Sequence, residues 1–204
     1  MEGQSCSKYG FPEPVEHLSE LDIEKGRYSP EEQLLLYNNL SNATPNSPEQ
    51  QNILEEICSD IENNRSKLYF IQGMGGSGKS ALCKKLLAWA RSKEKICLGC
   101  ASTGLAATIY ENFNTAHSLF KYPVLEDEDR DEANIVECQL STECNPKRLE
   151  LLQAAAVIVW DEFPSNHREL FEAVYRALNN FNGKVCVAFG DLEQIAPVVP
   201  HGSR

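Results

Sequence analysis

Two patterns of apolar residues alternate along most of the chain. Short runs that are continuously apolar predict buried strands, and longer stretches with apolar residues at helical spacing predict helices. The predicted strands cover residues 68–72, 96–101, 156–160 and 184–189. The predicted helices cover residues 79–91, 105–110, 146–154 and 166–179. This alternation is typical of an α/β fold, in which a doubly wound, mostly parallel sheet carries helices on both faces.

The N-terminal part of the chain has a different pattern. Residues 1–30 are rich in Pro, Glu and Ser without a sustained period, and we expect them to form a mobile arm. A short helix is expected over residues 31–40, followed by a linker. We therefore divide the chain into an arm and linker, residues 1–46, and one domain, residues 47–204.

A clear helix start opens the predicted domain. Ser47 is a suitable N-cap, Pro48 is a suitable first helical residue, and Gln50 completes a capping box. The apolar stripe that follows consists of Ile53, Leu54, Ile57 and Ile61. We expect a helix here, immediately before the first predicted strand.

The first predicted strand leads into a glycine-rich sequence that fits the pattern G-x-x-x-x-G-K-[ST] at every fixed position. Backbone N–H groups in such a loop converge on phosphate oxygens, and the positive end of the following helix strengthens the attraction. Lys79 is expected to reach the outer phosphates, and Ser80 to bind Mg²⁺. The predicted nucleotide-binding residues are Gly73, Met74, Gly75, Gly76, Ser77, Gly78, Lys79 and Ser80. We therefore expect the chain to bind a nucleoside triphosphate.

Two further segments follow predicted strands and should lie at the same edge of the sheet. The third predicted strand leads into two adjacent carboxylates, Asp161 and Glu162. Asp161 can hold Mg²⁺ together with Ser80, and Glu162 can orient and deprotonate an attacking water. Gln194 follows the last predicted strand, where it can hydrogen-bond the terminal phosphate. The candidate catalytic residues are therefore Lys79, Glu162 and Gln194, and the pair of acids favours hydrolysis of the nucleoside triphosphate.

Charge and composition narrow the choice of partner. The net charge of −11 argues against nucleic acid, but residues 67–124 hold eight basic and two acidic residues, which we interpret as a local basic face. Six acids fall within 126–132. We interpret residues 121–145 as a solvated insertion, or alternatively as an acidic mimic of nucleic acid. The eight cysteines lie in apolar runs, as is typical of a reducing compartment, and no secretory leader or membrane-spanning stretch is expected.

The three segments, in this order, resemble motifs of superfamily 1 DNA helicases, specifically the petite-integration-frequency family and the helicase part of Helitron transposon proteins. Ser47–Gln50 resembles the family's glutamine motif. Ala101–Thr108 resembles its single-strand-contacting motif, and Thr115–Phe120 resembles its Thr-x-His-Ser segment. The resemblance implies a RecA-like P-loop NTPase fold and ATP-driven 5′-to-3′ translocation on single-stranded DNA, with unwinding of duplex junctions. It also implies a role in replication, recombination, repair, telomere maintenance or transposition, in the nucleus or the mitochondrion.

The resemblance also assigns roles to single residues. Gln50 is expected to contact adenine, with its place in the capping box as the alternative. The residues implied to bind DNA are Ser102, Thr103, Gly104, His117 and Phe120. Their alternatives are structural: a helix start for the first three, a hydrogen bond for His117 and a core position for Phe120. Leu192 and Glu193 depart from the family pattern, in which Phe and Arg usually precede the glutamine.

Helicases of this kind use two RecA-like lobes, and the second lobe donates an arginine to the ATP site. The chain reaches only a short way past the third motif, so we interpret it as the first lobe. An arginine finger is worth roughly 10³–10⁵ in rate, so the chain alone should bind ATP and Mg²⁺ but hydrolyse ATP slowly. The alternatives are a non-catalytic fragment or transposon relic that binds nucleotide or DNA, and a small-molecule kinase. A kinase would leave Gln194 without a role.

Overall fold

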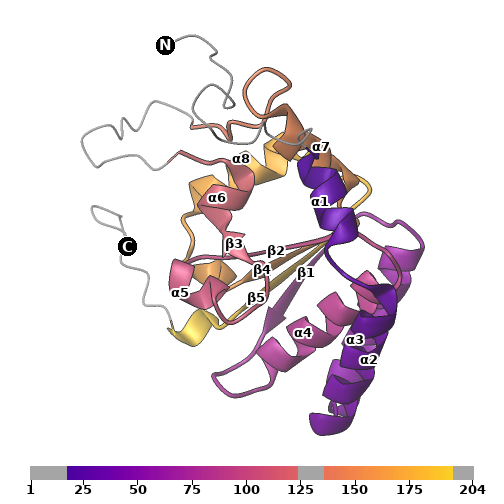
Figure 1. Ribbon diagram of the computed structural model, residues 1–204. Helices are drawn as coiled ribbons and strands as arrows, with labels where there is room; N and C mark the ends of the chain where they lie inside the picture. The colour runs from indigo at the N-terminus through magenta and orange to yellow at the C-terminus, as the bar shows by residue number, and fades with distance from the viewer. Residues whose placement is uncertain (1–17, 124–135, 195–204) are drawn as a thin grey trace, which may run out of the picture.

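A computed structural model describes residues 18–123 and 136–194, and these residues form a five-stranded sheet (Figure 1). The strands are β1 (Lys67–Gln72), β2 (Cys97–Ala101), β3 (Asn114–Thr115), β4 (Val157–Asp161) and β5 (Val185–Gly190). They lie in the order β1-β5-β4-β2-β3, and every neighbouring pair is parallel. The four strands predicted from apolar runs are confirmed, whereas the short β3 was not predicted.

Helices cover both faces of the sheet (Figure 1). On one face lie α3 (Pro48–Glu62) and α4 (Lys79–Ser92), with α2 (Pro30–Ala43) packed against α4. On the other lie α6 (Ala116–Phe120), α7 (Pro146–Ala154) and α8 (Arg168–Ala177), with α1 (Glu20–Gly26) packed against α7. Three short helical segments follow the ends of strands: α5 (Gly104–Ala107), η3 (Phe163–Ser165) and η4 (Leu192–Gln194). The doubly wound α/β architecture is therefore confirmed.

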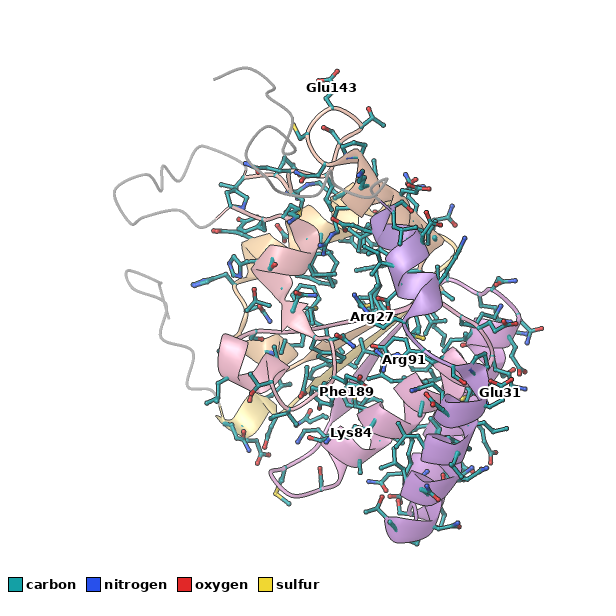
Figure 2. The ribbon with its side chains drawn as sticks, viewed as in Figure 1. Arg27, Glu31, Lys84, Arg91, Glu143 and Phe189 are labelled. Atoms are coloured by element: carbon teal, nitrogen blue, oxygen red, sulfur yellow. The ribbon has the colours of Figure 1, made fainter. Side chains whose placement is uncertain are left out.

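Alternate residues of the central strands belong to two separate cores. Val157 and Val159 of β4 pack with α3 and α4, whereas Ile158 and Trp160 pack with α6, α7 and α8. Phe189 of β5 is fully buried on the α4 side, where Figure 2 labels it. Burial on both faces explains why these strands are continuously apolar. The parallel strands bring the segments that follow them to one edge of the sheet.

The expectation of a mobile arm is wrong for residues 18–30, which contain α1 and the first residue of α2, and the expected linker is shorter because α2 continues to Ala43. The expected helix over residues 31–40 is confirmed as part of α2, and residues 1–17 lie outside the described ranges. Side-chain contacts join this segment to the domain. Arg148 Nε lies 2.6 Å from Glu20, and the Arg91 guanidinium lies 3.8 Å from the centroid of the Tyr28 ring. Lys85 Nζ bonds Asn46 at 2.5 Å and also bonds the Thr44 carbonyl. Figure 2 labels Arg91, which lies near the junction of α1 and α2. Because these contacts are polar and aromatic, they leave no apolar period in the sequence.

The acidic run 126–132 lies outside the described residues, so both interpretations of it remain predictions. Its C-terminal flank is described from residue 136. There Cys138 and Leu140 are half-buried against the core formed by α6, α7 and α8, and Glu137 pairs with Arg176 at 3.0 Å. The interpretation as a fully solvated insertion is therefore wrong for this flank. No helix in the described ranges is long and apolar enough to cross a membrane.

Candidate functional site

The glycine-rich loop joins the end of β1 to the start of α4. Gly76 and Gly78 have φ angles of 78° and 87°, in the left-handed region that glycine adopts without strain. At Gly73, a Cβ atom would lie 2.5 Å from the Ser77 hydroxyl oxygen and would displace that side chain. No side chain caps α4, so the N–H groups of its first turn remain available at the loop. The loop is therefore a cradle of backbone donors that suits an anion.

Lys79, the first residue of α4, folds back over this loop. Its ammonium group donates to the carbonyl oxygens of Gly73 and Met74, the latter at 3.0 Å. These two contacts hold the cation inside the curve of the loop. Phosphate oxygens carry a full charge and form stronger hydrogen bonds with an ammonium group than carbonyls do. A nucleotide phosphate in the cradle can therefore draw Lys79 to itself.

A cavity of about 490 Å³ opens beside the loop at the carboxyl edge of the sheet. Residues from all three predicted segments line it: Gly75, Gly76, Ser77, Gly78, Lys79 and Ser80 from the loop, Asp161 and Glu162 from the end of β4, and Gln194 from η4. The structure thus brings together segments far apart in the sequence. The cavity lining also includes Ile109 and Ser165, which sequence reasoning did not select.

The two adjacent carboxylates have different environments. Asp161 is only 7% exposed, and both its oxygens accept hydrogen bonds, Oδ1 from the Glu162 N–H at 2.9 Å and Oδ2 from the Tyr110 hydroxyl at 2.6 Å. Glu162 is exposed in the cavity wall, and its backbone adopts a left-handed conformation with φ of 50°. A fixed, buried carboxylate suits a cation, and a free, exposed one suits exchange of a proton with water. This difference agrees with the roles predicted for the two acids.

Tyr110 is a site residue that sequence reasoning missed. Its hydroxyl donates to Asp161 Oδ2 at 2.6 Å. Burial, with smaller contributions from Cys83 and Asp161, raises the pKa of this hydroxyl far above its usual value, so it stays a proton donor at neutral pH. Tyr110 follows a short helix in an irregular stretch, and no local pattern indicates that it reaches β4. Its role depends on a contact between residues 51 positions apart.

Gln50 joins the start of α3 to the glycine-rich loop. The capping box is present, because Gln50 Oε1 accepts from the Ser47 N–H at 3.1 Å and the Gln50 N–H donates to Ser47 Oγ at 3.2 Å. The remaining donor, Nε2, bonds the Ser77 carbonyl at 2.8 Å. The capping role is therefore confirmed, and the adenine contact stays a prediction. In this arrangement Gln50 fixes the position of the loop.

The side chain of Gln194 also lies against the glycine-rich loop, near Gly75. Its Nε2 lies 3.2 Å from the position that a Cβ atom on Gly75 would occupy. The end of β5 also packs closely against the acidic segment, since a Cβ atom on Gly190 would lie 2.2 Å from Pro164 Cδ. Glycine at position 190 therefore allows the second and third segments to touch. Gln194 lies where it can contact a phosphate held by the loop.

Comparisons with known proteins agree with this geometry. A sequence profile described as PIF1-like helicase matches residues 46–204. The chain belongs to the PIF1-like helicase family. Because that match covers the whole cavity wall, the RecA-like fold and the helicase resemblance are confirmed. No match was found among curated proteins.

Solved Pif1 helicases have the same fold. One structure, described as the basis for unwinding of forked dsDNA by two coordinating Pif1 helicases, is 27% identical, with a TM-score of 0.57 over 78% of this chain and 36% of that chain. Pif1 from Bacteroides with ADP-AlF3 and ssDNA is 27% identical, with a TM-score of 0.54 over 76% and 34%. Pif1 from Candida albicans is 27% identical, with a TM-score of 0.56 over 76% and 34%. The chain spans about a third of the length of these relatives.

In this PIF1-like chain, the residues predicted to contact DNA after β2 have structural partners. Ser102 Oγ donates to the Glu162 carbonyl and accepts from Asn166 Nδ2 at 2.5 Å, so it ties β2 to the acidic segment. Thr103 is the N-cap of α5, and its Oγ1 accepts from the Ala106 N–H at 3.2 Å. The helix-start interpretation is therefore confirmed for Thr103 and Gly104. Thr103 and Gly104 are exposed, and their DNA contacts stay predictions.

The two aromatic candidates differ from each other. Phe120 is fully buried, with its ring 5.2 Å from that of Trp160, so the predicted DNA contact of Phe120 is wrong and its core alternative is confirmed. His117 is half-buried, and its ring lies 5.7 Å from the ring of Tyr122. Burial, and to a smaller extent His167, lower the pKa of His117. Its ring is therefore neutral at pH 7 and adds no charge to a DNA-facing surface.

The core position of Phe120 predicts the effect of removing its ring. Phe120→Ala is expected to lower the free energy of unfolding by about 3–5 kcal/mol, because the cavity left beside Trp160 cannot fill completely. Urea denaturation measures this change. The matched control is Phe70→Ala, because Phe70 is 42% exposed and should cost much less. A folded Phe120→Leu variant that loses affinity for single-stranded DNA would contradict the assignment.

The basic block 67–124 does not form one basic face. Lys67 pairs with Glu56, Lys79 lies in the glycine-rich loop, and two more cations are buried in contacts with the N-terminal segment. At least half of the eight basic residues of the block therefore have partners within the described ranges. The sequence count overstated the charge available to an anionic polymer, because it cannot distinguish a surface lysine from an internal one.

Proposed function

We propose that this chain is the first motor lobe of an ATP-dependent DNA helicase that moves 5′ to 3′ on single-stranded DNA and unwinds duplex junctions. One observation carries the proposal: the loop after β1, the acids after β4 and the glutamine after β5 line a single cavity. Membership of the PIF1-like helicase family supports a DNA helicase. The Bacteroides relative solved with ADP-AlF3 and ssDNA supports nucleotide and single-stranded DNA as ligands.

The side chains at the site fit a nucleotide bound with Mg²⁺. Mg²⁺ prefers oxygen ligands and is commonly held by one or two carboxylates together with substrate phosphates. Ser80 and Asp161 both supply such oxygens to the cavity lining. Mg²⁺ would neutralise charge on the phosphates. Among the described residues, no cluster of three or more His, Cys, Asp or Glu residues offers a closed metal site.

Each site residue then has a separate task in hydrolysis. Lys79 exchanges its carbonyl partners for phosphate oxygens, and Asp161 with Ser80 would hold Mg²⁺. Glu162, exposed in the cavity wall, accepts a proton from the attacking water at its carboxylate. Gln194 hydrogen-bonds the terminal phosphate from η4. We further propose that a second lobe supplies the arginine that completes the site, which is worth roughly 10³–10⁵ in rate.

Unwinding of tailed duplexes tests the proposed function. The protein expressed from the complete reading frame is mixed with labelled duplexes that carry either a 5′ or a 3′ single-stranded tail. We expect ATP-dependent strand separation only with the 5′ tail, because a motor that moves 5′ to 3′ must load on that strand. Separation with the 3′ tail alone would contradict the direction. ATP-independent separation, or none with either tail, would contradict the motor function.

A further inference from the structure

Tyr110 connects the segment after α5 to the acidic end of β4. Its backbone N–H bonds the Ala107 carbonyl at 3.2 Å, so it continues from the last turn of α5. Its side chain is only 6% exposed and crosses to β4, where the hydroxyl donates to Asp161 Oδ2 at 2.6 Å. One phenol group therefore contacts a side chain that is expected to hold the cation.

The ring of Tyr110 is held from more than one side. Phe113 stacks on it, with 4.3 Å between ring centroids and an interplanar angle of 24°. Phe113 itself lies against Gly99 of β2, where a Cβ atom would come within 1.7 Å of its ring. The Lys84 ammonium lies 5.8 Å from the centroid of the Tyr110 ring. Packing therefore sets the position of the hydroxyl before any ligand is present.

The hydrogen bond to Asp161 fixes the orientation of that carboxylate. Oδ1 is held by the Glu162 N–H, and Oδ2 is held by Tyr110, so rotation of the carboxylate breaks a bond at each end. Each oxygen keeps a second lone pair that can face a cation or its water. Donors that hold a metal-binding carboxylate from behind typically contribute 10–100-fold to metal affinity.

We propose that Tyr110 is a positioning residue of the nucleotide site, whose hydroxyl sets the Asp161 carboxylate in place for one Mg²⁺. This inference rests on the proposed function and adds a residue that lies outside the three motifs. Tyr110 does not touch the nucleotide or the reacting water. It acts through Asp161, so its loss should change how binding depends on Mg²⁺ rather than binding in general.

The test removes a single oxygen atom. The chain carrying Tyr110→Phe is titrated with a fluorescent ADP analogue, once over a range of Mg²⁺ concentrations and once in EDTA. We expect the Mg²⁺ concentration for half-maximal binding to rise about 10-fold or more, with metal-free affinity unchanged. The variant Tyr110→Phe/Asp161→Asn should resemble Asp161→Asn alone, because the hydroxyl acts only through that carboxylate.

A second tyrosine–aspartate pair provides the matched control. Tyr69 of β1 donates to Oδ2 of Asp60, near the C-terminal end of α3, at 2.5 Å. Neither residue lines the cavity. Tyr69→Phe removes the same kind of hydrogen bond and should lower thermal stability without changing the Mg²⁺ dependence.

Three outcomes would overturn the inference: an unchanged Mg²⁺ dependence in Tyr110→Phe, an equal loss of affinity in EDTA, or the same shift in Tyr69→Phe. If the unmodified chain bound no nucleotide, the proposed function would fail together with the inference. If the unmodified chain bound nucleotide with Mg²⁺ and Tyr110→Phe behaved identically, the inference alone would fail.

Discussion

In a protein that also contains the proposed second lobe, Glu162→Gln is expected to bind ATP with unchanged affinity and to hydrolyse it about 10²–10⁴-fold more slowly. Glu162 is exposed in the cavity wall, and its side chain is not tied into the hydrogen bonds that hold Asp161. Glutamine keeps the shape of the side chain but cannot accept the proton of the attacking water. Steady-state release of phosphate gives the rate, and a fluorescent ATP analogue gives the affinity.

Asp161→Asn should behave differently, because Asp161 is buried and held at both oxygens. We expect this variant to need more Mg²⁺ for nucleotide binding, in addition to losing activity. Glu169→Gln is the matched control, since Glu169 is an exposed acid in the first turn of α8. If Glu162→Gln and Asp161→Asn had the same effect on Mg²⁺ dependence, the division of roles between the two carboxylates would be wrong.

Lys79→Ala is expected to weaken nucleotide binding by the isolated chain by about 10–100-fold, because a charged hydrogen bond to phosphate is worth about 1.5–3 kcal/mol. Its present partners, the carbonyls of Gly73 and Met74, are exposed enough to be satisfied by water, so the fold should survive. Circular dichroism checks the fold. Lys93→Ala, at the other end of the same helix, should bind nucleotide normally. Equal affinity in Lys79→Ala would remove Lys79 from the phosphate site.

The glycine-rich loop could be predicted from the sequence because its chemistry is local. Gly76 and Gly78 shape the backbone of one turn, and the Lys79 side chain bonds carbonyls of the same turn, so their spacing alone determines the geometry. Asp161 and Gln194 could be placed because parallel strands end at the same edge of a sheet. Each of these predictions needed only the order of the elements and the period of the apolar residues.

The residues that were missed or misassigned depend on contacts between distant parts of the chain. Tyr110 became a site residue through a hydrogen bond to β4, and Phe120 became a core residue through packing on Trp160. A resemblance to a motif placed Phe120 near DNA but could not show which way its ring points. Helix α1 and the two ends of α2 were not predicted. Contacts such as that of Arg91 with Tyr28 leave no period of apolar residues in the sequence. The Ser19 and Ser29 caps were local signals that could have indicated both helices.

Equilibrium titration of the unmodified chain with a fluorescent ATP analogue tests the central claim most directly, because it asks whether the converging segments form one nucleotide site. The account predicts saturable binding of one nucleotide per chain that is strengthened by Mg²⁺ and is displaced by unlabelled ATP or ADP. Absence of saturable binding, or binding that neither Mg²⁺ nor unlabelled nucleotide affects, would contradict it.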